Sequence, residues 1–339
     1  MDYQFCDCID SGTENCPCYL AATGDCLICS RLQGKECCDC RWNGVCIYNE
    51  FIQGGQRVNN PRKDFEVKII EKHTYMKDLI VFVLEVGKGF ALKASRPGSY
   101  VFLKAPDMED FYNAPISVLK SDVEKGYLHL AIKSLSGKTK LIAACEETLD
   151  VRGVYRNGVL GIKDVIGSRG RIDDRKKTLI IAKGVGFAPG ALLAEWASPK
   201  AEVDFLLDLD KITSELIRDY LPDRLNGKAK SVDLNAIFNQ QNRVSGIVTS
   251  DSFDSPNYDL AGFIKKGKYD IVVALTSDYY IDEIRKLLEN AREIDSDCVP
   301  ALTAYANNYH ICCGEGICGA CSKVDENGNV FKMCKCCEV

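Results

Sequence analysis

The pattern of hydrophobic and polar positions changes character twice along the 339-residue chain. From Phe65 onward, short runs of β-branched and aromatic residues alternate with turn residues such as Gly87–Gly89, which is typical of strands. Strands this short, at nearly regular spacing, predict a small antiparallel β-barrel followed by a short helix at Thr139–Ala144. The expected strands are Phe65–Glu71, Leu79–Val86, Ser99–Ala105, Ile116–Leu119 and Tyr127–Lys133.

A second pattern begins at Thr178, where strand-like and helix-like runs alternate. This alternation predicts βαβ units and a parallel sheet, and therefore a doubly wound α/β domain behind the barrel. The expected strands are Thr178–Ala182, Val203–Leu207, Gly246–Thr249, Ile271–Leu275 and Val299–Thr303. The expected helices are Ala191–Trp196, Ile212–Tyr220, Leu260–Lys265 and Tyr280–Ala291.

Residues 1–50 show no helical period and contain few aliphatic side chains, yet they hold ten of the 19 cysteines. Such a segment buries too little apolar surface to order itself, so metal ligation is expected to supply its folding free energy. Ten sulfurs suffice for one or two four-thiolate sites, of zinc (for example a knuckle from Cys26 and Cys29) or of an iron–sulfur centre. A disordered tail is the alternative. The expected ligands of this arm are Cys16, Cys18, Cys26, Cys29, Cys37, Cys38, Cys40 and Cys46.

Seven further cysteines lie in the last 28 residues, and four of them have the spacing C-x4-C-x2-C-x12-C. The intervening glycines let the backbone wrap closely and leave amide N–H groups free to point at the sulfurs. This spacing is typical of iron–sulfur sites, whereas structural zinc favours paired C-x2-C units, of which there is one here. We therefore predict a [2Fe-2S] cluster with a zinc knot as the alternative; its ligands are Cys313, Cys318, Cys321 and Cys334.

Composition narrows the class of protein. The net charge of −5 gives no basic surface for nucleic acid. No apolar run approaches the ~18 residues of a membrane span, and the N-terminus lacks the basic flank and apolar core of a signal peptide. Clustered thiols without an export signal favour metal binding in a reducing cytoplasm, as in an anaerobe, because such centres oxidise readily. His73, His129 and His310 are isolated, so no catalytic triad is expected.

These patterns divide the chain into five parts. A cysteine-rich metal-binding arm (1–50) is followed by a linker (51–63) that contains glycine, asparagine and proline. The barrel is expected over 64–165, the α/β domain over 175–304 and the cluster segment over 305–339. The fold class is thus α+β multidomain.

Six short motifs follow one another through the barrel and the α/β domain. They are Arg96-Pro-Gly98-Ser-Tyr100, Ala114-Pro115-Ile116-Ser117, Ser136-Gly137-Lys138-Thr139, Gly153-Val-Tyr155-Arg156-Asn157-Gly158, Gly184-Val185-Gly186 and Val248-Thr249-Ser250-Asp251. In this order, and with the C-terminal cysteines, they resemble the ferredoxin–NADP reductase superfamily. Within it the chain looks most like the iron–sulfur subunit of bacterial dihydroorotate dehydrogenase and the small subunit of bifurcating ferredoxin:NADP transhydrogenase. The resemblance covers 64–339 and leaves the arm outside.

The resemblance implies an FAD on the barrel and an oxidoreductase that passes electrons between NAD(P)H or a partner subunit, the flavin and the cluster. A flavin connects two-electron hydride carriers to one-electron clusters, and a helix N-terminus suits its pyrophosphate. The expected partner is a larger catalytic or electron-accepting subunit. The expected cofactor-binding residues are Tyr100, Ala114, Pro115, Ile116, Ser117, Lys133, Ser136, Gly137, Lys138, Thr139, Asn157, Gly158, Gly184, Gly186 and Asp208.

The sequence also departs from the superfamily's pattern. The arginine that usually precedes Pro-Ile-Ser is absent, so Lys133, Lys138 or Arg156 is the expected phosphate partner instead. The stretch Leu275–Asp278 replaces the usual Cys-Gly-Pro at the nicotinamide, and Lys183 replaces a glycine at the pyrophosphate. Acidic residues after the second α/β strand, Asp208 among them, favour NAD over NADP. Two alternatives therefore stay open: a relay subunit that has lost nicotinamide binding, and a non-enzymatic metal-binding adaptor.

Overall fold

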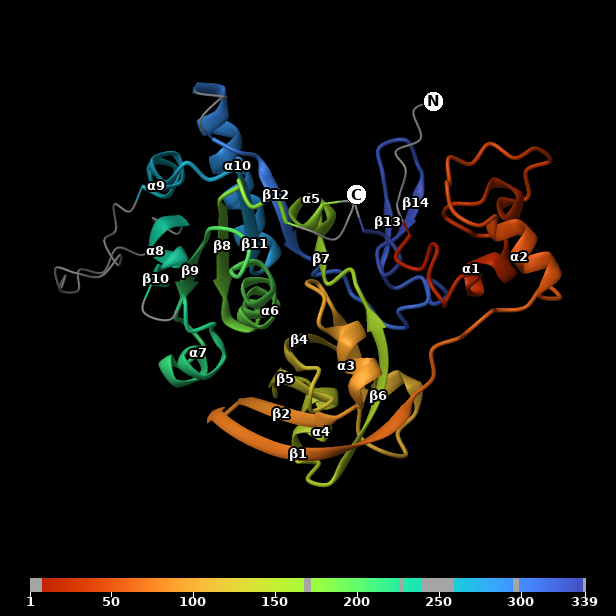
Figure 1. The fold of residues 1–339 in the computed structure, drawn as a ribbon, viewed down its shortest axis with the longest axis horizontal. Helices are drawn as coiled ribbons and strands as arrows, with labels where there is room; N and C mark the ends of the chain where they lie inside the picture. Colours follow the sequence, from red (N-terminus) through yellow and green to blue (C-terminus); the bar gives the residue numbers. More distant parts are fainter. Residues whose placement is uncertain (1–7, 168–171, 226–227, 239–258, 295–298, 338–339) are drawn as a thin grey trace.

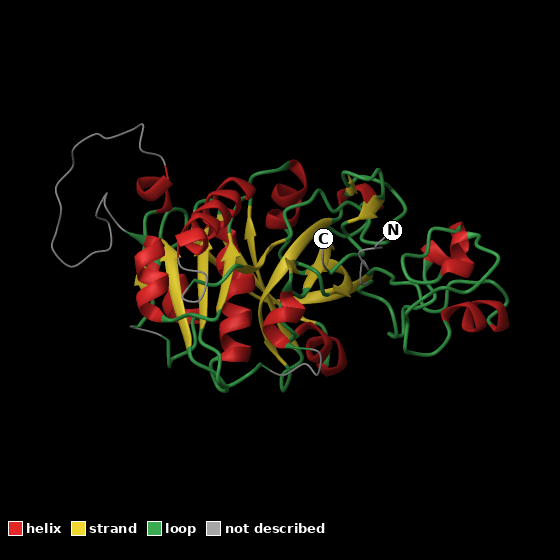
Figure 2. Ribbon diagram, turned by 90° about the horizontal axis from the view of Figure 1, so that it is seen from above, coloured by secondary structure: helices red, strands yellow, loops and turns green. Residues whose placement is uncertain are grey.

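The computed structural model describes residues 8–167, 172–225, 228–238, 259–294 and 299–337. In this part of the chain a closed barrel lies beside an α/β sheet, and the cysteine-rich arm lies on the other side of the C-terminal hairpin (Figure 1). The view from above shows the same sequence of bodies along the long axis (Figure 2). No described helix is long and apolar enough to cross a membrane.

The barrel closes with the strand order β1-β2-β5-β4-β3-β6. Its strands are β1 (Phe65–Met76), β2 (Leu79–Glu85), β3 (Tyr100–Lys104), β4 (Ala114–Asp122), β5 (Tyr127–Lys133) and β6 (Thr148–Tyr155). Strand β2 is buried on both faces: Phe82 and Leu84 fill the barrel core, whereas Leu79 and Val81 pack against the α/β domain. The two domains therefore share one continuous apolar contact.

Three helical segments lie in the connections between the barrel strands: α3 (Lys88–Ala94), η2 (Asp110–Tyr112) and α4 (Gly137–Ala144). The turn expected at Gly87–Gly89 is wrong, because Gly87 is instead the residue before α3. The buried Ala91 and Ala94 give that short helix its packing face. Strand β6 was not anticipated from the sequence, and α4 begins two residues before its expected start.

The second sheet has the order β10-β9-β8-β11-β12-β7, with β7 antiparallel at its edge. Its strands are β7 (Val159–Leu160), β8 (Thr178–Lys183), β9 (Val203–Asp208), β10 (Lys230–Ser231), β11 (Ile271–Leu275) and β12 (Leu302–Ala306). Strands β8 to β12 run parallel, which confirms the α/β interpretation. Strand β7 joins this sheet, although the sequence boundary at 165 grouped it with the barrel, and β12 begins three residues later than expected.

Helices cover both faces of this sheet, as a doubly wound fold requires. The face toward the barrel carries α5 (Ile162–Ile166), α6 (Phe187–Ala197) and α7 (Ser214–Tyr220), with η3 (Gly184–Gly186) leading into α6. The other face carries α8 (Leu234–Phe238), α9 (Leu260–Gly267) and α10 (Asp278–Ile294). The strand expected at Gly246–Thr249 and the motif at Val248–Asp251 lie outside the described residues.

From Cys8 onward, where the structure describes it, the arm holds two short helices, α1 (Tyr19–Thr23) and α2 (Ile47–Gln53), and the turn η1 (Ser30–Gln33). Helix α2 extends into the segment expected to be linker. Contrary to the sequence analysis, the arm has a small core of its own, which includes Ile28, Leu32 and Phe51. The cluster segment ends in a hairpin of β13 (Ser322–Val324) and β14 (Val330–Lys332).

Candidate functional site

The four C-terminal cysteines of the iron–sulfur spacing meet in space. The Cys313 thiol is hydrogen-bonded to those of Cys334 and Cys318, and Cys334 is also hydrogen-bonded to Cys321. Cys334 and Cys321 are buried, whereas Cys318 is exposed at the edge of the group. The structure therefore brings together all four predicted cluster ligands.

Backbone amides point at these sulfurs. The amide of Glu315 donates to Sγ of Cys313 at 3.3 Å, and the amide of Cys334 donates to Sγ of Cys321 at 3.3 Å. The hydrogen bond from Cys334 lowers the pKa of Cys313 to about 3, and another lowers the pKa of Cys321 to about 6. The same hydrogen bonds raise the pKa of Cys334, and burial raises the pKa of Cys318. Thiolates are the form that ligates metal, so two of the four thiols favour that form, and metal binding would displace the protons of the other two.

The loop between the ligands depends on left-handed backbone. Gly314, Gly316 and Gly319 have φ of 71°, 79° and 75°, a region in which side chains are disfavoured. Among the described residues, no three His, Cys, Asp or Glu side chains are arranged to hold a single metal ion. A [2Fe-2S] cluster places two thiolates on each of two irons, which spreads its ligands further apart than one ion does. Four convergent thiols satisfy the ligand count of a [2Fe-2S] cluster and of a structural zinc site alike.

A buried network of charges fixes the arm to the cluster segment. Lys335 follows Cys334 directly, is fully buried, and its ammonium lies 2.6 Å from Asp10 and 2.9 Å from Glu315. The guanidinium of Arg62 lies 2.6 Å from Asp10 and stacks over the ring of Tyr155 at 4.4 Å. The Tyr155 hydroxyl donates to Glu315 at 2.8 Å. No local pattern of the sequence indicates this network, because its members are far apart along the chain.

The expected flavin-binding strand is present as the first residues of β4. Ala114 and Ile116 are buried in the barrel, Pro115 is exposed and Ser117 is half-buried. The Asn113 side chain, immediately before this strand, is buried with no hydrogen-bond partner for its amide nitrogen or oxygen among the described residues. A buried amide without a partner is costly, so it marks a place where a polar group of a ligand would be accommodated.

The expected pyrophosphate turn is the N-terminus of α4. Ser136 accepts a hydrogen bond from the amide of Thr139, whose hydroxyl accepts from the amide of Ser136, which is a capping box. The side chains of this turn therefore hold the helix start. The amides of Gly137 and Lys138 are the groups left to face an anion.

Two other expected flavin contacts face the cluster segment. Tyr100 is buried and stacked on Tyr155, with ring centroids 5.1 Å apart and an interplanar angle of 18°. The buried Asn157 side chain donates to the carbonyls of Met333 and Cys336 at 2.8 and 2.9 Å. The neighbouring Gly158 admits no side chain, because a Cβ would lie 2.9 Å from the carbonyl oxygen of Gly98.

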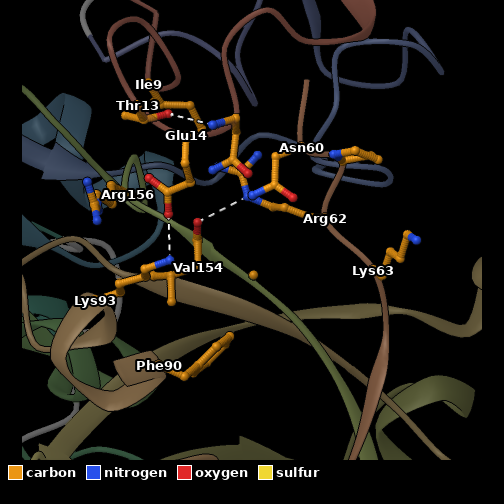
Figure 3. A pocket seen from close by; sticks show the side chains of 13 residues that line it. Ile9, Thr13, Glu14, Asn60, Arg62, Lys63, Phe90, Lys93, Val154 and Arg156 are labelled. Carbon is orange, nitrogen blue, oxygen red and sulfur yellow. Dashed lines mark hydrogen bonds and ion pairs between the residues drawn. The ribbon is translucent and has the colours of Figure 1, made fainter. Parts of the chain in front are cut away.

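The three candidate phosphate partners lie in different surroundings. Lys133 pairs with Asp78 at 3.5 Å, and Lys138 lies 4.5 Å from the centre of the Phe111 ring. Arg156 instead lines a cavity of about 310 Å³ between the arm, the linker, α3 and β6 (Figure 3). The structure therefore leaves Lys138, beside the start of α4, as the cation nearest the expected pyrophosphate turn.

The expected nucleotide loop is closed by an ion pair. Lys183 lies 2.6 Å from Asp208, and their side chains are 10% and 3% exposed. Asp208 also accepts hydrogen bonds from the amides of Asp210 and Leu234 at 3.0 Å each. The carboxylate expected to bind ribose hydroxyls is thus engaged within the protein.

The glycines of the same loop differ in their surroundings. Gly184 has φ of 58° and open space beside its Cα. Gly186 is in the opposite situation, because a Cβ there would lie 1.9 Å from the carbonyl oxygen of Leu275. Gly186 therefore permits close packing of α6 against β11, whatever else it binds.

The arm cysteines fall into two groups. Cys8, Cys16, Cys18 and Cys26 line one small cavity. The second group lies around η1: the sulfurs of Cys38 and Cys40 are 3.6 Å apart, and Cys29 and Cys37 lie close by. Cys46 stands at the start of α2 and is exposed. Cys26 and Cys29 stay in contact, because the amide of Cys29 donates to Sγ of Cys26 at 3.4 Å. Cys8, which was not among the expected ligands, lines the same cavity as Cys16, Cys18 and Cys26.

No known family profile and no curated protein matches this sequence. Among solved structures, an NADH-dependent reduced ferredoxin–NADP oxidoreductase, studied for flavin-based electron bifurcation, aligns with a TM-score of 0.53 at 16% identity over 79% of this chain and 85% of that chain. A phthalate dioxygenase reductase aligns with a TM-score of 0.48 at 15% identity over 81% and 96%. A ferredoxin NADP+ reductase from Neisseria gonorrhoeae aligns with a TM-score of 0.47 at 13% identity over 68% and 92%. The first of these structures confirms the predicted fold: this chain has the fold of ferredoxin–NADP reductases.

Proposed function

We propose that this chain is the electron-transfer subunit of a flavin- and iron–sulfur-dependent oxidoreductase. The observation that carries the proposal is the meeting of Cys313, Cys318, Cys321 and Cys334 beside a ferredoxin–NADP reductase-type barrel. In this assignment the four thiolates hold a [2Fe-2S] cluster, and β4 with the start of α4 holds FAD. A larger subunit would be the electron donor or acceptor.

The chain's own residues bind and orient these groups. Ala114 to Ser117, the first residues after Asn113 in β4, would hold the flavin ring, and the amides of Gly137 and Lys138 at the start of α4 would bind its pyrophosphate. The amides of Glu315 and Cys334 stabilise thiolates. A bound flavin supplies exchange of electrons in pairs with a hydride carrier and singly with a cluster. No side chain needs to act as nucleophile or general base.

The test is cofactor analysis of anaerobically purified protein. We expect one FAD and at least about two irons with matching sulfide per chain. The double variant Cys318→Ser/Cys321→Ser should lose about two irons and keep its FAD. Cys145→Ser, which removes a thiol far from this group in the barrel domain, is the matched control and should change neither content. A wild-type protein that contains zinc but no iron and no flavin would refute the proposal and favour a metal-binding adaptor.

One observation favours a second candidate, a relay fed by a partner rather than by NAD(P)H. The Lys183–Asp208 ion pair occupies the end of β8 and β9, where an anionic dinucleotide would need open backbone and a free carboxylate. A buried pair of this kind resists separation, because each charge would lose its partner in a poorly solvated site.

Titration of the oxidised protein with NADH separates the two candidates. For the relay we expect the ~450 nm flavin absorbance to remain after NADH addition and to bleach with dithionite, since the flavin itself is reducible. Bleaching by stoichiometric NADH would assign the chain to the NAD(P)H-linked reductases instead.

A further inference from the structure

Four cysteines of the arm surround a single small cavity. They come from the first described residues and from the turns on either side of α1. The rest of the wall is mostly apolar, with Leu20, Ala21, Ile28 and Ile47. Cys18 and Cys26 are each only 8% exposed. The four are Cys8, Cys16, Cys18 and Cys26.

Each of these sulfurs accepts a hydrogen bond from a backbone amide. In three cases the donor lies two residues further along the chain: Asp10 for Cys8, Leu20 for Cys18 and Ile28 for Cys26. Cys26 also accepts from the amide of Cys29 at 3.4 Å, and Cys16 accepts from the amide of Gly12. The C-terminal group shows the same two-residue step, from Glu315 to Cys313 and from Ala320 to Cys318.

Burial and amide donation act in opposite directions on these thiols. A thiolate in this mostly apolar cavity is poorly solvated, so burial disfavours it. The amide donors instead favour the thiolate. A cationic centre bound among the sulfurs would stabilise buried thiolates here, because it compensates the negative charge that the amides help to stabilise.

The arrangement suits a multinuclear centre. The four cysteines line one cavity, and backbone amides donate to their sulfurs as they do to the C-terminal sulfurs, which are the surroundings that iron–sulfur clusters have. A four-iron cluster is a larger body that keeps four thiolates apart, whereas zinc draws them around one point. We propose that Cys8, Cys16, Cys18 and Cys26 bind a [4Fe-4S] cluster.

This site adjoins the C-terminal cysteines. Cys8 forms a β-bridge with Cys336, and the amide of Ile9 donates to the carbonyl of Lys335 at 2.9 Å. Leu20, from the cavity wall, packs against Gly316 of the cluster loop. If the proposed function holds, one electron leaves one cluster and enters the other, with no bond or proton changed. Binding at the arm site stands independently of the flavin and of the C-terminal cluster.

The test is iron and sulfide analysis with Mössbauer and EPR spectroscopy of the full chain, reconstituted anaerobically. We expect about six irons per chain in the wild type. The arm variant Cys18→Ser/Cys26→Ser should keep about two irons and lose the [4Fe-4S] spectrum. The C-terminal variant Cys318→Ser/Cys321→Ser should keep about four irons and that spectrum. Cys145→Ser, which removes a thiol of the barrel domain outside both cysteine-rich segments, is the matched control and should equal the wild type.

An arm variant with the full iron content and an unchanged spectrum would overturn the proposal, as would zinc in place of the four irons in wild-type protein. Should the arm variant fail to fold, the C-terminal variant decides: a [4Fe-4S] spectrum there supports the site, and its absence refutes it. Failure of the proposed function has a different signature, namely no iron lost from the C-terminal variant.

Discussion

Lys335 and Asp10 are separated by 325 positions, and their side chains are 0% and 1% exposed. Burial of such charges is costly unless they are paired, and here Arg62 and Glu315 complete the pairing. Burial alone would raise the pKa of Asp10, but Lys335 and Arg62 lower it below its usual value. The carboxylate is therefore ionised in the folded protein and holds the arm against the cluster segment.

Asp10→Asn is expected to weaken that attachment. The substitution leaves Lys335 and Arg62 with the carboxylate of Glu315 as their shared partner. Breaking a buried ion pair costs about 3–5 kcal/mol of stability. Glu14→Gln is the matched control: Glu14 and Lys93 also lie 2.6 Å apart, but their side chains are 43% and 52% exposed. An exposed pair contributes less than about 1 kcal/mol. Hydrogen exchange of the arm amides measures how far each variant loses protection, and equal losses in Asp10→Asn and Glu14→Gln would contradict this account.

At the scale of elements, the contact of α6 with β11 is set by a glycine. Gly186 lies in the loop that was expected to approach a pyrophosphate, yet the backbone of β11 already occupies the space beside it. Helix α6 is buried along most of its length, so this contact positions the helix between the sheet and the barrel.

Gly186→Ala is therefore expected to destabilise the fold by about 1–3 kcal/mol, because the new methyl group overlaps a carbonyl oxygen that belongs to a buried strand. Gly89→Ala is the control, since a Cβ there meets no atom within 4 Å and Gly89 lies in α3. Alanine favours a helix over glycine by up to about 1 kcal/mol. Urea denaturation measures both changes, and a stable Gly186→Ala protein would contradict the packing argument.

Another contact between elements joins the barrel to α7. Nδ1 of His129 in β5 lies 3.1 Å from the Tyr220 hydroxyl, and the two rings meet edge to face. Burial, reinforced by Lys120, lowers the pKa of His129 to about 4. The folded protein therefore holds this imidazole neutral over a range in which the unfolded chain, with a histidine pKa of about 6.5, binds a proton.

The sign of the pH effect follows. The unfolded state gains protons first as pH falls, so stability should drop by about 3 kcal/mol in total between about pH 6.5 and pH 4. His129→Gln should remove this part of the pH dependence, whereas His73→Gln, at an exposed site on β1, should retain it. Denaturation midpoints at several pH values measure the effect, and parallel curves for the wild type and His129→Gln would rule it out.

At the scale of the whole molecule, the arm, the barrel and the cluster segment meet at one place. Tyr155 of β6, Arg62 of the linker and Glu315 of the cluster loop contact one another there. Figure 1 shows the arm, with α1 and α2, beside the C-terminal hairpin of β13 and β14 at one end of the molecule, and α8 and α9 of the α/β domain at the other end. If the proposed clusters are present, a partner that exchanges electrons with them would approach the end that carries the arm.

The order of domains was predictable because it depends on local periodicity. Short runs of β-branched and aromatic residues between turn residues predicted five barrel strands, and the alternation of strand-like and helix-like runs predicted the parallel sheet. Strand β6 was not predicted, because Arg152 and Gly153 interrupt its apolar run. Helix α3 was not predicted either, because two glycines precede its buried alanines. Such elements are stabilised by tertiary contacts, which outweigh local propensity.

The spacing of the C-terminal cysteines determined a four-thiolate site by itself, because all four ligands lie within one short loop and its hairpin. The tertiary structure alone decided that Cys8 lines one cavity with Cys16, Cys18 and Cys26, and that Lys183 closes the nucleotide loop. The physical reason is distance along the chain. A ligand set or an ion pair made of remote residues depends on the path of the backbone, and no local pattern records that path.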